Sequence, residues 1–213
     1  MTGETLKARL RERLALAESW LPDQAAAKSD FDLNPGFDLG PRELRPAAVL
    51  IPLIERPEGV SVLLTRRADT LTKHSGQIAF PGGRLDPGET AVEAALREAQ
   101  EEVALDPAVV EILGLGDAYE TGTGFLITPV VGWLVEPPVV APSEAEVADI
   151  FETPWDFLMD AANHRRDFLD MADGDRRWFW AMPWEDRYIW GVTAGVIRAL
   201  RVRLYGDIDE AAA

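Results

Sequence analysis

Cysteine is absent from the 213-residue sequence, which excludes disulfide bonds and thiolate metal ligands. Its absence suits a reducing compartment, and the charged N-terminus lacks the apolar core of a signal peptide, so we expect a cytoplasmic protein. No apolar run approaches the length that crosses a bilayer, and we therefore expect no membrane partner.

Positive charge is scarce, because 21 Lys and Arg residues stand against 37 Asp and Glu residues, for a net charge of −16. Proteins that bind duplex nucleic acid normally present a basic face, and the sequence disfavours that partner. An acidic protein can still bind a phosphorylated small molecule if metal ions or a local basic patch make the electrostatic potential positive near the binding site. The apolar fraction of 47% is ordinary for a globular protein with a real core.

Hydrophobic patterning changes between strand and helix periods along the chain. Strands are predicted near 47–54, 60–65, 76–80, 111–120, 125–135, 144–152, 176–182 and 187–190, and helices near 4–19, 90–103, 154–160 and 191–204. This order favours an α/β fold with a mixed sheet between helices rather than a fold in which strands and helices alternate regularly. We expect a helix and loop extension over residues 1–45, a main domain over 46–206 and a short tail over 207–213.

The helix predicted near 90–103 is the most informative element, because it follows a Gly/Pro-rich turn and carries many carboxylates. At about 100° per residue its apolar residues form one arc, while Glu98, Glu101 and Glu102 form another. Three adjacent carboxylates repel one another unless a hard cation such as Mg²⁺ lies between them, and that cation can carry a phosphate. An acidic helix can also be simply solvated, so the flanking residues decide between the two readings.

Those flanking residues are in register with a known signature. Gly83, five residues, Glu89, seven residues, and then Arg97-Glu98 and Glu101-Glu102 resemble the signature of the Nudix hydrolases. The resemblance implies a Nudix-type α/β/α sandwich with a mixed β-sheet, here preceded by an N-terminal helical extension.

The same resemblance implies roles for individual residues. Glu98, Glu101 and Glu102 would hold Mg²⁺ or Mn²⁺, with the Gly83 carbonyl as a further ligand, and Glu98 or a nearby carboxylate would assist attack of water on a diphosphate. Mg²⁺ prefers oxygen ligands and retains bound water, which agrees with this chemistry. Arg97 would act beside them by pairing with the supporting residue Glu89 and fixing the loop against the helix.

One position departs from the signature, since Ala104 stands where the family has glycine. If the helix ends there with a positive φ, alanine costs on the order of 1 kcal/mol in that conformation. The alternative is a helix that continues slightly further.

Residues 63–83 resemble a narrower signature, that of the coenzyme A diphosphatase branch of the same family. Leu63-Leu64-Thr65, Arg67-Ala68, Gly76 and Phe80-Pro81-Gly82-Gly83 carry this resemblance, whereas Thr72 stands where the branch has arginine and Lys73 lies beside it. The resemblance implies hydrolysis of the diphosphate of coenzyme A or acyl-CoA, giving 3′,5′-ADP and (acyl-)4′-phosphopantetheine.

Candidate substrate contacts in this segment are Arg66, Arg67 and Lys73, three cations close together in an acidic chain, and Gly82, where the backbone can approach a ligand closely. Strand alternation sends Arg66 and Arg67 to opposite faces, so only one of them need reach the ligand from the strand. Each cation alone could equally be a solvated rim residue.

Other interpretations remain open. The substrate could be another nucleoside diphosphate derivative such as ADP-ribose or a dinucleotide, or the chain could be a nucleotide-sensing module without catalysis. The apolar stripe of residues 4–19 could form a homodimer contact or pack onto its own domain. Tryptophans crowd the last third of the chain, either as core or as a stacking surface for adenine. His164 is expected in an exposed loop.

Overall fold

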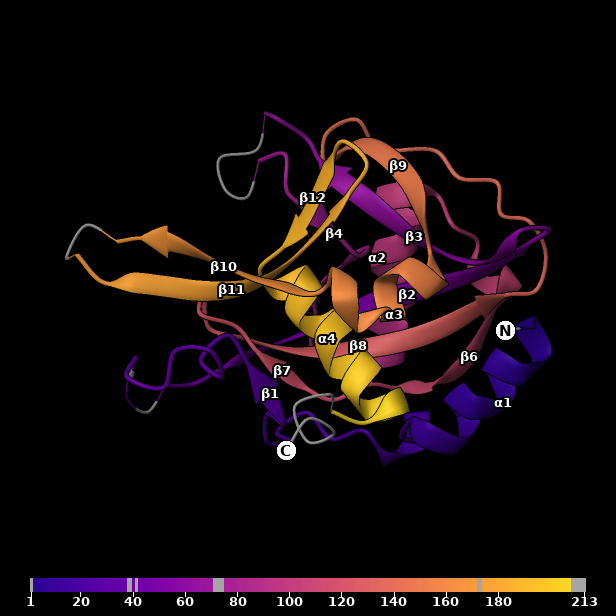
Figure 1. The fold of residues 1–213 in the computed structure, drawn as a ribbon. Helices are drawn as coiled ribbons and strands as arrows, with labels where there is room; N and C mark the ends of the chain where they lie inside the picture. Colours follow the sequence, from indigo (N-terminus) through magenta and orange to yellow (C-terminus); the bar gives the residue numbers. More distant parts are fainter. Residues whose placement is uncertain (1, 38–39, 41, 71–74, 172–173, 208–213) are drawn as a thin grey trace.

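A mixed β-sheet with helices on both faces forms the body of the molecule in a computed structural model (Figure 1). The structure describes residues 2–37, 40, 42–70, 75–171 and 174–207. Two long strands, β2 (Arg45–Arg56) and β8 (Phe125–Leu134), run parallel in the middle of the sheet. The predicted α/β architecture with a mixed sheet and an N-terminal helix is confirmed.

The remaining strands pair around these two, and the described residues form a nine-stranded main sheet and a three-stranded second sheet. The main sheet also contains β1 (Lys28–Ser29), β3 (Gly59–Arg67), β4 (Ile78–Ala79), β5 (Gly82–Arg84), β6 (Val110–Leu115), β7 (Tyr119–Glu120) and β9 (Val147–Pro154). The second sheet consists of β10 (Arg165–Asp170), β11 (Arg176–Trp184) and β12 (Arg187–Trp190), and its β10–β11 hairpin projects from the body (Figure 1).

Helix α2 (Ala91–Val103) covers one face of the main sheet, whereas α3 (Trp155–Met159) and α4 (Val192–Tyr205) cover the other. The alternation of β2 explains the two layers, because successive side chains point to opposite faces. Leu50 and Ile54 pack in the core under α2, and Ile51 and Leu53 pack in the core under α4. None of the described helices combines the length and apolar character that crossing a bilayer requires.

Helix α2 begins and ends with identifiable caps. Thr90 forms a capping box with Glu93, in which each side chain accepts a hydrogen bond from the other residue's backbone N–H. The helix ends at Val103, and Ala104 adopts the left-handed conformation with φ 56° and ψ 25°. The signature glycine is therefore replaced by alanine at a position whose conformation favours glycine.

We expect Ala104→Gly to stabilise the protein. Relief of the left-handed strain gains about 1 to 2 kcal/mol, and the greater freedom of glycine in the unfolded chain offsets part of it. A net gain of about 1 kcal/mol corresponds to a rise in Tm of about 2 to 4 °C, measurable by differential scanning calorimetry. Ala94→Gly, inside the same helix, is the control and should lower the Tm; a lower Tm for Ala104→Gly as well would contradict the expectation.

The N-terminal helix is shorter than predicted. Helix α1 covers Gly3–Arg13, and the prediction that it continues to residue 19 is wrong. The chain leaves the helix because the backbone of Ala15 pairs with Leu115 of β6 in both directions, at 3.0 and 2.8 Å. Leu6 and Leu10 are buried in the core that they share with α4, so the apolar stripe packs onto its own domain and is not free for a dimer contact.

The last third of the chain also contains a strand that the sequence did not reveal. The segment following His164 forms β10, and the expectation of an exposed loop there is wrong. His164 is buried, with Nε2 at 2.7 Å from the carbonyl oxygen of Leu158. Burial lowers the pKa of this histidine, which therefore serves as a neutral structural residue.

Candidate active site

Glu98, Glu101 and Glu102 form the acidic flank of α2, and their side chains differ sharply in exposure. The side chain of Glu101 is 60% exposed, that of Glu98 is 17% exposed and that of Glu102 is 6% exposed. Helix α2 packs against β5, and Glu102 accepts a hydrogen bond from this strand. A carboxylate buried in this way retains its charge only if donors or cations surround it.

Glu102 is the most deeply buried of the three. Its Oε2 accepts a hydrogen bond from the Gly82 N–H at 3.2 Å, and its Oε1 lies 3.9 Å from Nη1 of Arg67. Burial, together with the charges of Glu98 and Glu146, raises the pKa of Glu102 to about 7, although the Gly82 hydrogen bond and Arg67 oppose the shift. The neighbouring donors therefore do not fully replace the water that the carboxylate has lost.

Glu98 depends on the absence of a side chain at Gly83. A Cβ atom at residue 83 would collide with the carboxylate of Glu98, so a larger residue there would push this carboxylate out of its present position. Burial raises the pKa of Glu98, while its hydrogen bond to Arg97 opposes the shift. Gly82 is more strictly constrained, since a Cβ there would collide with the backbone of Ala48 and Val49 in β2.

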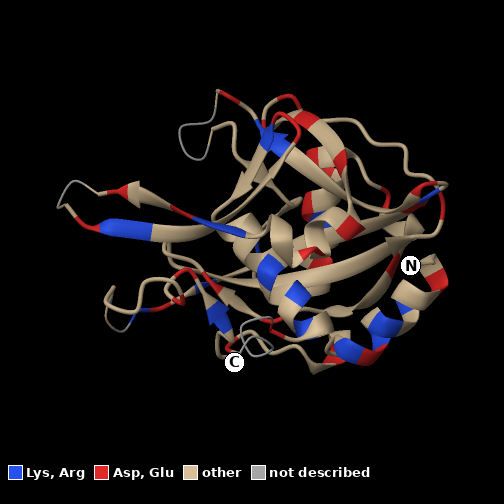
Figure 2. Cartoon of the chain, in the orientation of Figure 1, with Lys and Arg blue, Asp and Glu red and all other residues tan. Residues whose placement is uncertain are grey.

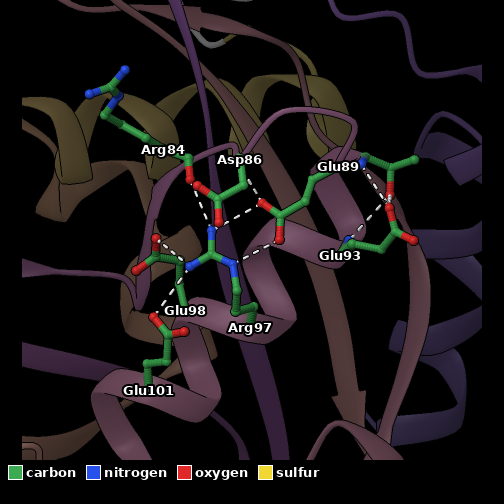
Figure 3. A network of polar contacts seen from close by, with 8 residues as sticks. Arg84, Asp86, Glu89, Glu93, Arg97, Glu98 and Glu101 are labelled. Carbon is green, nitrogen blue, oxygen red and sulfur yellow. Dashed lines mark hydrogen bonds and ion pairs between the residues drawn. The ribbon is translucent and has the colours of Figure 1, made fainter.

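Arg97 holds the turn and the helix together (Figure 3). Its Nε and Nη2 bind the two carboxylate oxygens of Glu89 at 2.8 and 3.1 Å, which is the bidentate pair that the signature implies. Nη2 also donates to the carbonyl oxygen of Arg84 at 3.0 Å. Nη1 donates to Glu98 at 3.0 Å and to Glu101 at 3.2 Å. The hydrogen bonds to Glu89 and then to Glu98 raise the pKa of Arg97.

The donor set suits a hard divalent cation. In the described part of the chain no three His, Asp or Glu side chains converge as a preformed metal site, since Arg97 binds Glu98 and Glu101 while Glu102 binds Gly82. All the donors are oxygens, and burial raises the pKa values of Glu98 and Glu102, so a bound cation would stabilise their ionised forms. These residues therefore fit Mg²⁺ or Mn²⁺.

The predicted substrate contacts are placed differently from one another. Arg66 forms an ion pair with Asp69 at 2.9 Å at the surface, whereas Arg67, after an irregularity in the β3–β9 register, turns toward Glu102. Lys73 lies outside the described residues. Of these three cations, the structure therefore brings only Arg67 next to the acidic flank among the residues it describes.

A cavity of about 400 Å³ opens beside this arginine on the α4 face of the main sheet. Gly82 and Arg67 lie at its Glu102 end. Aromatic side chains line it together with aliphatic and polar ones, and the aromatic ones include Phe80, Phe125, Phe179, Trp180 and Trp190. A larger hollow of about 530 Å³ along β9 contains none of the predicted site residues. The carboxylate flank and the aromatic cavity thus meet at Gly82.

The cavity includes residues that sequence reasoning did not single out. Ser29, Asp30 and Leu33 reach it from the segment taken as a loop extension, and Tyr119 and Arg177 reach it from the two sheets. Arg177 follows Arg176 in a polar start to β11, and that polarity is a weak signal that surface strands share. Basic residues also lie on α1 and α4 (Figure 2).

Comparison with known proteins agrees with this arrangement. The NUDIX domain family matches residues 44–171. A relative from Shigella flexneri serotype 5b, called uncharacterized Nudix hydrolase NudL, is 41% identical over 175 residues, which cover 81% of this chain and 89% of the relative. The protein of the same name from Cronobacter sakazakii is 42% identical over 175 residues, with the same coverage.

Solved structures with a similar fold share less of the sequence. An Ap4A hydrolase from C. elegans has a TM-score of 0.46 and 23% identity, and the match covers 54% of this chain and 82% of that one. RenU, a Nudix hydrolase from M. smegmatis, has a TM-score of 0.46 and 27% identity, covering 54% and 73%. On the match over residues 44–171 and the identity to the NudL proteins, the chain belongs to the Nudix hydrolase family.

Proposed function

We propose that this protein hydrolyses the diphosphate of coenzyme A or acyl-CoA, giving 3′,5′-ADP and (acyl-)4′-phosphopantetheine. Action on a phosphorus anhydride follows from family membership, and members of the family generally need a divalent cation such as Mg²⁺. The observation that carries the narrower proposal is the meeting of Arg67 and Glu102, 3.9 Å apart, at the wall of the aromatic cavity. An anhydride beside Glu102 could thus extend an organic group into that cavity.

The proposed roles follow from the contacts. Glu98, Glu101 and Glu102, with the Gly83 carbonyl, would hold Mg²⁺ or Mn²⁺, which neutralises phosphate charge and activates water. Glu98 receives a proton as the water oxygen attacks phosphorus and the bond from phosphorus to the bridging oxygen breaks. The Arg67 guanidinium binds a phosphate oxygen, and the Gly82 backbone allows its close approach.

The proposal is tested by product analysis. Incubation of the protein with coenzyme A and Mg²⁺, followed by mass spectrometry, should give 3′,5′-ADP and 4′-phosphopantetheine in equal amounts and no product after chelation of the metal. In ¹⁸O-labelled water, one product phosphate should gain a single ¹⁸O atom, because one water supplies one oxygen to one phosphorus.

A substrate panel compared by kcat/KM separates the alternatives. A kcat/KM for ADP-ribose or a dinucleotide clearly above that for coenzyme A would replace the proposed substrate while keeping the hydrolase. Tight nucleotide binding without turnover of any diphosphate in the presence of Mg²⁺ or Mn²⁺ would indicate a sensing module instead.

A further inference from the structure

The cavity has a second cation at a wall remote from Arg67. Arg177 of β11 lines the cavity together with Gly122 of the turn between β7 and β8. In the main sheet, β7 is separated from β3, the strand of Arg67, by β8 and β2. Three strand spacings amount to roughly 14 Å, so the two arginines belong to different ends of one cavity.

The Arg177 guanidinium lies directly against Gly122, where a Cβ atom would collide with it. Its Cζ lies 5.1 Å from the centre of the Phe37 ring, within the range of a cation–π contact. Within the described residues, this guanidinium forms no hydrogen bond and no ion pair. Arg177 is half-buried and lines the cavity, and its N–H groups form no hydrogen bond to the described residues. Such a guanidinium is suited to bind an anionic group of a ligand.

The charge of Asp30 interacts with that of Arg177, but the hydrogen bonds of the Asp30 oxygens go to other groups. Oδ1 accepts from the Tyr119 hydroxyl at 3.0 Å and Oδ2 accepts from the Gly122 N–H at 2.7 Å. The carboxylate therefore fixes the β7–β8 turn on which Arg177 rests, and no hydrogen bond joins it to the guanidinium, which lines the cavity.

A second contact holds the strand of Arg177 in place. The buried side-chain amide of Asn34 accepts from the N–H of Trp178 at 2.8 Å and donates to the carbonyl oxygen of the same residue at 2.9 Å. The segment from Asp30 to Asn34 thus binds both the main sheet and β11. The far end of the cavity is a built structure, and Arg177 is part of it.

We propose that Arg177 binds a second phosphate of the substrate, a phosphomonoester on the ribose, at the end of the cavity remote from Glu102. This inference rests on the proposed function, because the 3′-phosphate of coenzyme A is such a group. Arg67 then contacts the diphosphate, the aromatic walls contact the nucleoside, and Arg177 distinguishes a 3′-phosphorylated nucleotide from one without that phosphate.

Binding of product-like nucleotides tests the subsite without turnover. By isothermal titration calorimetry, the unmodified protein should bind 3′,5′-ADP at least about tenfold more tightly than 5′-AMP, as expected for one charge-assisted contact. Arg177→Gln should remove most of this preference, and Arg177→Lys should retain part of it. Arg176→Gln is the matched control, because the Arg176 side chain pairs with Asp170 at the surface and should leave the preference intact.

Kinetics gives the second measurement. The ratio of kcat/KM for coenzyme A to that for 3′-dephospho-coenzyme A should fall about tenfold in Arg177→Gln, and mainly through KM. Equal affinity of the unmodified protein for 3′,5′-ADP and 5′-AMP would overturn the subsite, and so would an unchanged ratio in a folded Arg177→Gln protein. If coenzyme A is not hydrolysed but the Arg177-dependent preference persists, the proposed reaction fails while the subsite stands.

Discussion

Glu102→Gln should lower kcat about a thousandfold and should also stabilise the metal-free protein. The loss of rate follows if Glu102 helps to hold the cation, because a catalytic metal supplies several kcal/mol of transition-state stabilisation. Glutamine retains the oxygen that accepts the Gly82 N–H, so the fold around the residue is kept. The gain in stability follows because the buried charge is removed.

The size and the pH dependence of the gain in stability follow from the pKa of Glu102. The ordinary value is 4.5, and in the folded protein it rises to about 7, so the folded state binds the proton more tightly. A group of this kind destabilises the fold progressively as the pH rises from about 4.5 to 7. Denaturant unfolding without metal should therefore find Glu102→Gln more stable by on the order of 3 kcal/mol at pH 8, and no more stable at pH 4.

The control for this experiment is Glu58→Gln, an equal change of charge at an exposed residue in the β2–β3 turn. It should alter neither kcat nor the pH dependence of unfolding. Full activity of Glu102→Gln at saturating Mg²⁺ would remove the carboxylate from the proposed metal site, whereas lower stability at pH 8 would contradict the burial argument.

Arg97→Lys should cost about 2 to 3 kcal/mol of stability, or about 5 to 10 °C in Tm, and about a hundredfold in kcat/KM. Lysine keeps the charge but cannot form the fork that binds both oxygens of Glu89 while also reaching Glu98 and the Arg84 carbonyl. The turn carrying Gly83 would then no longer be fixed against α2, and the carboxylates would lose their arrangement.

Arg84→Lys is the matched control, because the Arg84 side chain points away from this network and only its carbonyl takes part (Figure 3). Thermal unfolding and steady-state kinetics on both variants measure the two effects. If Arg97→Lys unfolds at the same temperature as Arg84→Lys, the fork contributes little to stability, and the explanation of the Glu89 pair is wrong.

Local sequence was sufficient to predict several elements. Helix α2 and its separate acidic flank follow from 3.6-residue spacing. Strands β2 and β3 are buried over most of their length, and they follow instead from apolar runs bounded by Pro and Gly. Strand β10 was missed because nearly all of its residues are exposed, so its sequence has no alternation to read. The end of α1 was missed because it is set by pairing of Ala15 with a distant strand.

The site was predictable only in part for the same reason. The spacing of Gly83, Glu89 and Arg97 predicts the part of the site that lies on α2, because the residues in contact there are close together in sequence. The cavity depends on contacts such as that between Asp30 and Gly122, which are 92 residues apart. No local pattern encodes such a pairing, so the sequence indicates only an extension before residue 46. The division of the chain at that residue stays a prediction.

Asn34 has a consequence for solubility as well. Strand β12 covers β11 only from Ala181 onward, so the same side of Trp178 presents backbone groups that a foreign strand could pair with. The amide of Asn34 occupies that N–H and that carbonyl, as a neighbouring peptide group would. One side chain thus blocks strand addition, and its loss would expose an edge through which copies of the chain could aggregate.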